Sequence, residues 1–292
     1  MQIPRFWKRA AAKVTGHDGK PWKLPRWGWS ANSAVEAETM AETRARNTEQ
    51  KWTAGRFQPT NWYQPGFYED LPPREEIIDE VADSLGNTQA LVTRNAYGSL
   101  VLNTDRMLII DVDQPQNPNA VGSLIKKAIG VFFSRAAPPA EIPQNVLPQN
   151  LREALNQSTR QFRVYQTAAG WRLIMCDAAI GAVDKASLEI MRQFPVDQQY
   201  LRLCERQKTC RARLTPKSWR VGLERPRYRY PFDSAPEKAS MAKWSDSYLK
   251  AIEGHATCRL LEGHDLPIAP ELAQLIELHD QLSGVDSEAP LA

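Results

Sequence analysis

The chain has 292 residues, with 37 lysines and arginines against 34 aspartates and glutamates, so its net charge is only +3. This length gives room for one large domain or two small ones. No apolar run approaches the roughly 20 residues of a membrane span, the start lacks the apolar core of a secretion signal, and four cysteines are too few for a disulfide scaffold. We therefore expect a protein of a bacterial-type cytoplasm with no membrane partner.

Tryptophans are concentrated in the first 72 residues, where lysines, arginines and prolines lie between them. Ser33 followed by Glu36 is a capping-box pattern and predicts a helix over residues 33–56. A proline- and aromatic-rich connector, residues 59–73, follows. The tryptophans either pack an extended arm onto the main body, which we favour, or offer stacking platforms for bases. Six of the nine lie in this region: Trp7, Trp22, Trp27, Trp29, Trp52 and Trp62.

The remaining chain mixes strands and helices without regular βαβ units, which favours an α+β fold with a mixed or antiparallel sheet core and flanking helices. We expect an N-terminal arm with helices (1–85), a catalytic-type core (86–232) and a C-terminal helical segment (233–292). The elements predicted after the connector are a short acidic helix (74–85), a hairpin (90–103) turning near 95–98, a strand ending at 113, an apolar helix (121–133), a proline-rich loop (136–148), a helix (151–158), two strands (161–165 and 171–176), and helices at 184–194, 239–255 and 271–282.

The strand ending at Asp113 is the most informative stretch of the sequence. Apolar residues 107–110 run directly into Asp111 and Asp113. Residues i and i+2 of a strand lie on one face, so both carboxylates project from a sheet edge, where like charges are costly unless a cation shares them. Hard divalent metals prefer such oxygen ligands. Alternatively, the two acids cap a loop or pair with nearby arginines.

Residues 197–230 are strongly basic, although the whole chain is nearly neutral. A segment this basic, in the same chain as a pair of metal-type carboxylates, suggests a polyanionic ligand such as a nucleotide or a nucleic acid. A solvated basic face is the alternative. The ten basic residues are Arg202, Arg206, Lys208, Arg211, Arg213, Lys217, Arg220, Arg225, Arg227 and Arg229, against the acidic Asp197, Glu205 and Glu224.

Two further motifs follow the aspartate strand in a fixed order. The second is residues 165–172 (Tyr-Gln-Thr-Ala-Ala-Gly-Trp-Arg), and the third runs from Asp197 to residues 211–217 (Arg-Ala-Arg-Leu-Thr-Pro-Lys). In this order the chain resembles, over roughly residues 88–220, the catalytic core of the archaeo-eukaryotic primase superfamily, the primase-polymerases. That family has an Asp-x-Asp strand, then a turn with a small hydroxyl residue, glycine and histidine, then a further acid on a strand.

The resemblance implies a role for each motif. Asp111, Asp113 and Asp197 would hold Mg²⁺ or Mn²⁺ and be catalytic, with a nucleoside triphosphate and a single-stranded or template nucleic acid as partners in DNA replication. Arg172 stands where the family has histidine, and arginine can still clamp a phosphate bidentately. The nucleotide-binding residues expected in this way are Thr167, Gly170, Arg172, Arg202, Arg211, Arg213 and Lys217. The whole chain also resembles a group of uncharacterised bacterial proteins that share residues 3–7 (Ile-Pro-Arg-Phe-Trp), 27–30 and 211–217.

Other site types have less support. A zinc site formed by Cys204, Cys210, His255 and Cys258 is a weaker alternative to buried thiols, because the cysteine spacing is unusual. His264 and His279 are expected to be structural. The sequence lacks a phosphate-binding Gly-x-x-x-x-Gly-Lys-Ser/Thr loop. It also lacks Gly-x-Ser-x-Gly and His-Glu-x-x-His, which argues against common serine hydrolases and zinc proteases.

The favoured function is a metal-dependent nucleotidyltransferase of primase-polymerase type acting on nucleotides and a nucleic-acid template. Carboxylate-bound metal neutralises triphosphate charge and lowers the pKa of an attacking hydroxyl, and basic side chains stabilise charge on the phosphoryl oxygens. A second hypothesis, favoured by Arg172 in the histidine position, is a non-catalytic nucleic-acid-binding or assembly protein on a degenerate primase-like fold. A third is a metal-dependent nuclease that uses the same acids.

Overall fold

The computed structural model describes residues 3–16, 18–56, 72–114 and 146–292. Within them the chain forms three sheets with helices around them, and every named strand pair is antiparallel. The predicted α+β class is confirmed. The apolar helix expected at 121–133, and most of the segments at 59–73 and 136–148, lie outside the described residues. No helix in the described part of the chain is long and apolar enough to cross a membrane.

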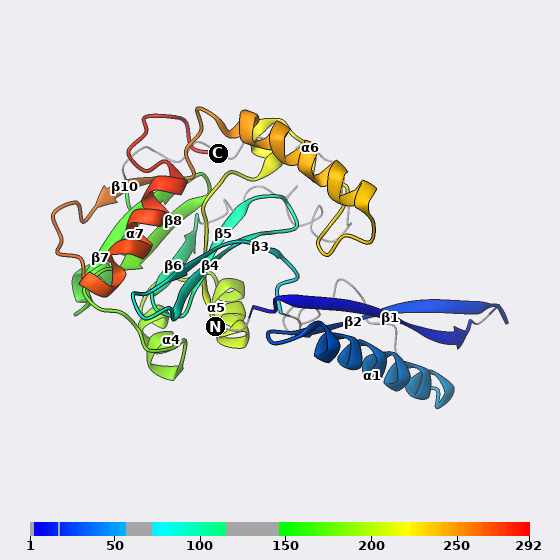
Figure 1. Cartoon of the computed structure of the whole chain (residues 1–292). Coiled ribbons are helices and arrows are strands. Elements are labelled where there is room, and N and C mark those ends of the chain that lie inside the picture. Colours follow the sequence, from blue (N-terminus) through cyan, green and yellow to red (C-terminus); the bar gives the residue numbers. More distant parts are fainter. Residues whose placement is uncertain (1–2, 17, 57–71, 115–145) are drawn as a thin grey trace, which may run out of the picture.

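The N-terminal arm is a two-layer unit that extends away from the main body (Figure 1). Strands β1 (Phe6–Thr15) and β2 (Pro21–Ser30) pair over their whole length, and helix α1 (Ala34–Thr53) packs on this hairpin. Ser33 caps α1 by accepting a hydrogen bond from the Glu36 amide at 3.1 Å, as predicted. The hairpin itself was not predicted, although Asp18-Gly19 is a typical turn pair and Gly19 has a φ of +74°.

The tryptophans of the arm pack mainly against one another. Trp7 is only 8% exposed and lies edge-on to Trp27, with ring centroids 6.5 Å apart, and 5.6 Å from Trp29. Trp22 makes a T-shaped contact with Trp52 at 5.9 Å. The rings therefore have a packing role, but these contacts lie inside the arm, whereas the expected packing was onto the main body.

The first sheet of the main body has the order β3-β4-β5-β9, with β3 (Glu76–Ala82), β4 (Thr88–Arg94), β5 (Leu100–Thr104) and β9 (Cys210–Arg213). The hairpin turn predicted near residues 95–98 is confirmed. The acidic helix predicted at 74–85 is wrong, because this segment forms β3. Strand β3 lies at a sheet edge, and Val81 is its one buried residue. The sequence of this segment is therefore as polar and charged as that of an exposed helix. Pairing with β4 decides that it forms a strand.

The second sheet of the main body has the order β10-β7-β8-β6. Strand β6 (Ile109–Asp113) lies at its edge, as predicted, beside β8 (Gly170–Met175), which pairs with β7 (Phe162–Thr167). Strand β10 (Cys258–Glu262) pairs with β7 and was not predicted. The segments assigned to the arm and to the C-terminal region thus contribute β3 and β10 to the two sheets of the main body.

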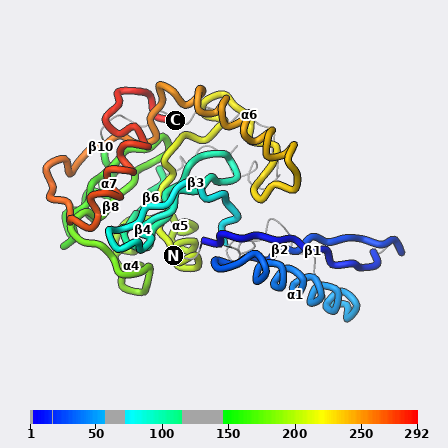
Figure 2. The backbone as a smooth tube through the Cα atoms, viewed as in Figure 1, coloured from blue at the N-terminus to red at the C-terminus, as the bar shows by residue number. Residues whose placement is uncertain are grey.

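The helices close the main body around these sheets (Figure 2). One continuous cluster of buried apolar side chains reaches from β4 and β5 through β6, β7 and β8 to α7, so the two sheets share a core. The helices are α3 (Gln149–Gln157), α4 (Lys185–Arg192), α5 (Gln198–Gln207), the short 3₁₀ helix η1 (Ser218–Val221), α6 (Ala235–Ile252) and α7 (Pro270–Ser283).

We predict that Gly28→Ala loosens the arm. A Cβ at Gly28 would lie 2.1 Å from the Ala37 carbonyl oxygen and 2.3 Å from the Ala41 amide nitrogen of α1. Since backbone atoms cannot give way as a flexible side chain can, the change should cost about 1–3 kcal/mol of stability. Urea unfolding followed by tryptophan fluorescence measures this cost. Gly181→Ala, with nothing within 4 Å of its added Cβ, is the control and should be nearly neutral. Equal stability of both variants would contradict the packing described.

Candidate active site at the end of strand β6

Asp111 and Asp113 lie at the carboxyl end of β6 and are separated by the buried Val112. The Asp111 side chain is 34% exposed, and Asp113 is exposed. In the register with β8, Asp111 lies opposite Arg172 and Asp113 lies opposite Gly170. The predicted pair of carboxylates is therefore present at a sheet edge, and the Arg172 motif is brought directly beside it.

Arg172 is the most deeply buried charged group at this edge, with a side chain only 2% exposed. Its Nε donates to Asp111 Oδ1 at 3.0 Å, and its Nη1 donates to the Arg213 carbonyl at 2.9 Å. Nη1 also lies 3.4 Å from Cys258 Sγ and 3.1 Å from His279 Nε2. Burial is the largest single influence on Arg172 and lowers its pKa, but the opposing effects of Asp111, Cys258 and Tyr200 together exceed it. The pKa is therefore raised, and the guanidinium remains charged.

A buried polar chain continues behind Arg172 into helix α7. Burial lowers the pKa of His279, so the neutral ring accepts from Arg172 at Nε2 and donates from Nδ1 to Asp280 at 2.8 Å. Asp280 also accepts from Arg163 at 2.8 Å, and Arg163 Nε donates to the Tyr165 hydroxyl at 2.9 Å. These contacts help to fix the position of Arg172. The buried His279 takes part in them and so has a structural role, as expected from the sequence.

Three further cations lie near this pair of carboxylates. Lys217 is electrostatically coupled to Asp111 and Asp113, Arg213 is coupled to Asp111, and Arg220 is coupled to both of these cations. Burial, followed by repulsion from Arg213 and Arg220, lowers the pKa of Lys217 to about 8, although Asp113 and Asp111 act in the opposite direction. Burial, followed by repulsion from Arg172, lowers the pKa of Arg213 to about 10. Burial also lowers the pKa of Arg220. Since these cations disfavour one another, an added anion would be stabilised among them.

Unsatisfied hydrogen-bond donors occur at the same place. The Nε of Arg213, the Oγ of Ser218 and the Nη1 of Arg220 are buried and have no hydrogen-bond partner among the described residues. Buried donors of this kind are costly unless a ligand or water satisfies them. Donors without partners, in a region with a surplus of positive charge, suit the oxygens of a phosphate.

The turn between β7 and β8 brings backbone close to Asp113. Gly170 leaves no room for a side chain, because a Cβ there would lie 2.1 Å from the Val112 carbonyl oxygen. The Gln114 amide donates to the Ala169 carbonyl at 2.9 Å. Thr167 Oγ1 lies 3.4 Å from the Ala169 amide, within its own turn. The second motif therefore adjoins the carboxylate pair through its backbone.

The structure does not bring Asp197 into the site as a third carboxylate. Its amide donates to the Asp111 carbonyl at 3.0 Å, so the backbone is adjacent, but its carboxylate caps α5 and accepts from the Gln199 amide at 2.7 Å and the Tyr200 amide at 3.4 Å. Asp197 begins a helix and not a strand, because an aspartate before an apolar helical pattern is a preferred N-cap. In the described ranges, no three His, Cys, Asp or Glu side chains form a group that could hold a metal ion.

Two of the arginines predicted to bind nucleotide are directed elsewhere. Arg211 forms a bidentate ion pair with Glu75, at 2.6 and 2.8 Å. Arg202 lies on the exposed side of α5 and donates to the Gln198 carbonyl of its own helix. Of the predicted set, Thr167, Gly170, Arg172, Arg213 and Lys217 lie beside the aspartates or the strand that carries them.

The cysteines are buried free thiols, as favoured from the sequence. Cys258 contacts Arg172, and burial raises the pKa of Cys204, which adjoins Cys210. The zinc alternative built from these cysteines and His255 does not form a metal-binding group in the described part of the chain. Burial that raises a thiol pKa disfavours the thiolate that binds zinc.

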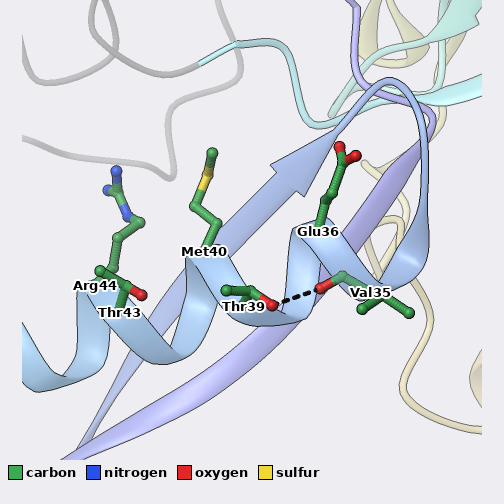
Figure 3. A pocket seen from close by; sticks show the side chains of 6 residues that line it. All are labelled: Val35, Glu36, Thr39, Met40, Thr43 and Arg44. Carbon is green, nitrogen blue, oxygen red and sulfur yellow. Dashed lines mark hydrogen bonds between the residues drawn. The ribbon is translucent and has the colours of Figure 1, made fainter.

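Sequence reasoning missed two parts of the site. Arg220 belonged to the basic segment, but only the 3₁₀ helix η1 places it beside Lys217. Asp280 carried no sequence signal, because its partner Arg163 is 117 positions away. A pocket on the arm (Figure 3) is lined on α1 by Val35, Glu36, Thr39, Met40, Thr43 and Arg44. Glu36 is the one carboxylate among these lining residues, so they supply no carboxylate pair for a metal ion.

We predict that replacing Asp111 destabilises the protein more than replacing Asp113. Asp111→Ala leaves the buried Arg172 guanidinium without its opposing charge and should cost roughly 3 kcal/mol in the free energy of unfolding. Asp113→Ala changes an exposed residue and should cost less than about 1 kcal/mol. Asp111→Asn, which can keep the hydrogen bond but not the charge, should lie between them. Urea unfolding measures all three, and equal costs at positions 111 and 113 would contradict the pairing.

No protein-family model matches this chain, and neither curated proteins nor solved structures yielded a match. The resemblance to primase-polymerases therefore rests on the sequence motifs alone. The chemistry around β6, β8 and β9 is what bears on function.

Proposed function

We propose that the protein is a metal-dependent nucleotidyltransferase of primase-polymerase type, acting on nucleoside triphosphates and a nucleic-acid template. The observation that carries the proposal is the surplus of buried cations beside a two-carboxylate strand end. Asp111 is electrostatically coupled to Arg172, Arg213 and Lys217, and Asp113 to Lys217. Arg220 adds a fourth cation beside Arg213 and Lys217, whereas Arg172 is neutralised by Asp111. The unbalanced charge suits a triphosphate, whose own charge exceeds what one divalent metal neutralises.

The donor set fits Mg²⁺ or Mn²⁺ that arrives with the substrate. Mg²⁺ is commonly held by one or two carboxylates together with waters and substrate phosphates, and does not need a complete protein cage. Asp111 and Asp113 supply two such carboxylates from one strand face. When bound, the metal would neutralise phosphate charge and acidify an attacking hydroxyl.

The side chains of this site then divide into two groups. Arg213, Lys217 and Arg220 bind phosphate oxygens, because they are partly buried and mutually repulsive. Arg213 and Arg220 also each carry a donor that has no hydrogen-bond partner among the described residues. Arg172 and the chain behind it fix the orientation of Asp111. This division separates residues whose loss should weaken substrate binding from residues whose loss should first affect stability.

A second candidate function has specific support. Arg172 occupies Asp111 Oδ1, and the Asp197 carboxylate is used as a helix cap. Both observations favour a non-catalytic protein that binds nucleic-acid phosphates without metal. The two functions differ in one measurable respect, since phosphate binding by basic side chains alone needs no divalent ion and weakens steeply with salt.

Calorimetric titration of a nucleoside triphosphate with Mn²⁺ tests the proposal. We expect binding to the wild-type protein, a loss of at least about tenfold in affinity for Asp113→Ala and Lys217→Ala, and little change for Lys185→Ala, an 89% exposed control on α4. Asp113 is chosen because its removal should spare the fold. Binding that is equally strong in EDTA and in Asp113→Ala would favour the non-catalytic candidate. Primer extension then tests catalysis, and degradation of a labelled strand without nucleotides would indicate a nuclease.

Nucleotide affinity should fall as the pH rises through about 8. The pKa of Lys217 is lowered to about 8, so below that pH the side chain is a cation that attracts phosphate, and above it the side chain is increasingly neutral. Lys217→Arg, which stays charged, should move this loss to higher pH. Affinities measured at about pH 7 and pH 9 for both proteins check this. An identical decline in the two proteins would assign the titration to another group.

A further inference from the structure

A group of stacked arginines and aromatic rings begins next to Lys217 and leads away from the aspartates. The Lys217 ammonium lies 5.3 Å from the ring centroid of Trp219, which is 37% exposed. Tyr97, from the β4–β5 turn, packs edge-on against Trp219 at 5.0 Å. The exposed Arg225 lies 5.0 Å from the Trp219 centroid and 4.6 Å from that of Tyr97.

This group continues toward the N-terminal arm. Arg227 stacks on Tyr228 at 5.4 Å, and a small surface pocket between Ala96 and Pro226 includes Tyr228, Arg229 and Arg74 in its walls. We call the surface formed by Tyr97, Trp219, Arg225, Arg227, Tyr228 and Arg229 the arginine–aromatic strip.

The arm meets the far end of the strip. Arg74 lies 4.2 Å from the ring centroid of Trp27 on β2. Tyr230 donates to the Arg5 carbonyl at 3.3 Å, and Asp233 pairs with Arg9 at 2.9 Å, so the segment that leads into α6 contacts β1 (Figure 1). Trp27 thus lies next to the end of the strip, with Arg74 between them.

Positive charge exceeds negative charge along the strip. Acidic groups are present, since Glu76 lines the pocket, Asp233 pairs with Arg9, and Glu224 lies beside Arg225 in the chain. Burial, followed by repulsion from Arg229 and Arg9, nevertheless lowers the pKa of Arg74, with Asp233 acting in the opposite direction. A polyanion placed along this surface would relieve that repulsion.

We propose that the arginine–aromatic strip binds single-stranded nucleic acid. The strip alternates arginines with the exposed Trp219 and the half-buried Tyr97 and Tyr228. This alternation matches that of phosphates and bases in an unpaired strand, whose bases can stack on the rings. A duplex hides its base faces, so it would use the charge of the strip but not Trp219 or Tyr97. The strip begins at Lys217 in the proposed nucleotide site, so its identification as the template path rests on the proposed function.

Fluorescence anisotropy of a labelled oligothymidylate, in EDTA and without nucleotide, tests the proposal. We expect Trp219→Ala to weaken binding about tenfold or more, and Trp219→Phe to retain most of the affinity because stacking survives. Arg225→Ala and Arg229→Ala should each weaken binding and reduce the steepness of its salt dependence by about one unit. Arg46→Ala, on an exposed part of α1, is the matched control and should leave affinity unchanged. Circular dichroism confirms that each variant is folded.

The outcomes separate this proposal from the proposed function. Loss of oligothymidylate binding in the Trp219 and Arg225 variants, with nucleotide–Mn²⁺ binding retained, supports the strip. The same loss, in a wild-type background that binds no nucleotide, also supports nucleic-acid binding by the strip, but it overturns the proposed nucleotidyltransferase function. Wild-type protein that fails to bind oligothymidylate at low salt overturns the strip. Equal affinity for polyglutamate and oligothymidylate, unaffected by Trp219→Ala, would assign this surface to acidic polypeptides and also overturn it.

Discussion

A guanidinium shielded from solvent stays charged only if protein groups replace the water that it has lost. For Arg172 these groups come from separate parts of the chain: the Asp111 carboxylate on β6, the Arg213 carbonyl on β9, Cys258 on β10 and His279 on α7. The four segments must therefore assemble around one side chain. Asp111 supplies the opposing charge, so this pairing also fixes where the carboxyl end of β6 lies.

The same pairing decides which cations remain for a ligand. Arg172 is directed inward and balanced, whereas Arg213, Lys217 and Arg220 share their position with donors that have no partner in the described residues. Two of them have a pKa lowered first by burial and then by the other cations. The proposed anion-binding role therefore rests on the balance of charge, and not on the number of arginines in the segment.

The carboxylate pair and the basic segment are parts of one surface. Lys217 is electrostatically coupled to Asp111 and Asp113 on one side and contacts Trp219 on the other. A small reactive ligand and a long polyanion could thus be held next to one another, as transfer of a nucleotide to a strand requires. The arm adjoins the far end of this surface through the contact between Arg74 and Trp27.

The sequence by itself determined what local patterns encode: the buried strand that ends in Asp113, the hairpin turn at 95–98 and the helix capped by Ser33, because alternation, turn residues and caps act over a few positions. Only the tertiary structure decided the rest. Pairing with β4 makes residues 76–82 a strand. The Asp197 carboxylate caps helix α5 and does not join the expected metal ligands. Arg211 pairs with Glu75 and is not available for the expected phosphate contact. These outcomes depend on partners distant in sequence, and a side chain with two possible partners binds the one that folding places within reach.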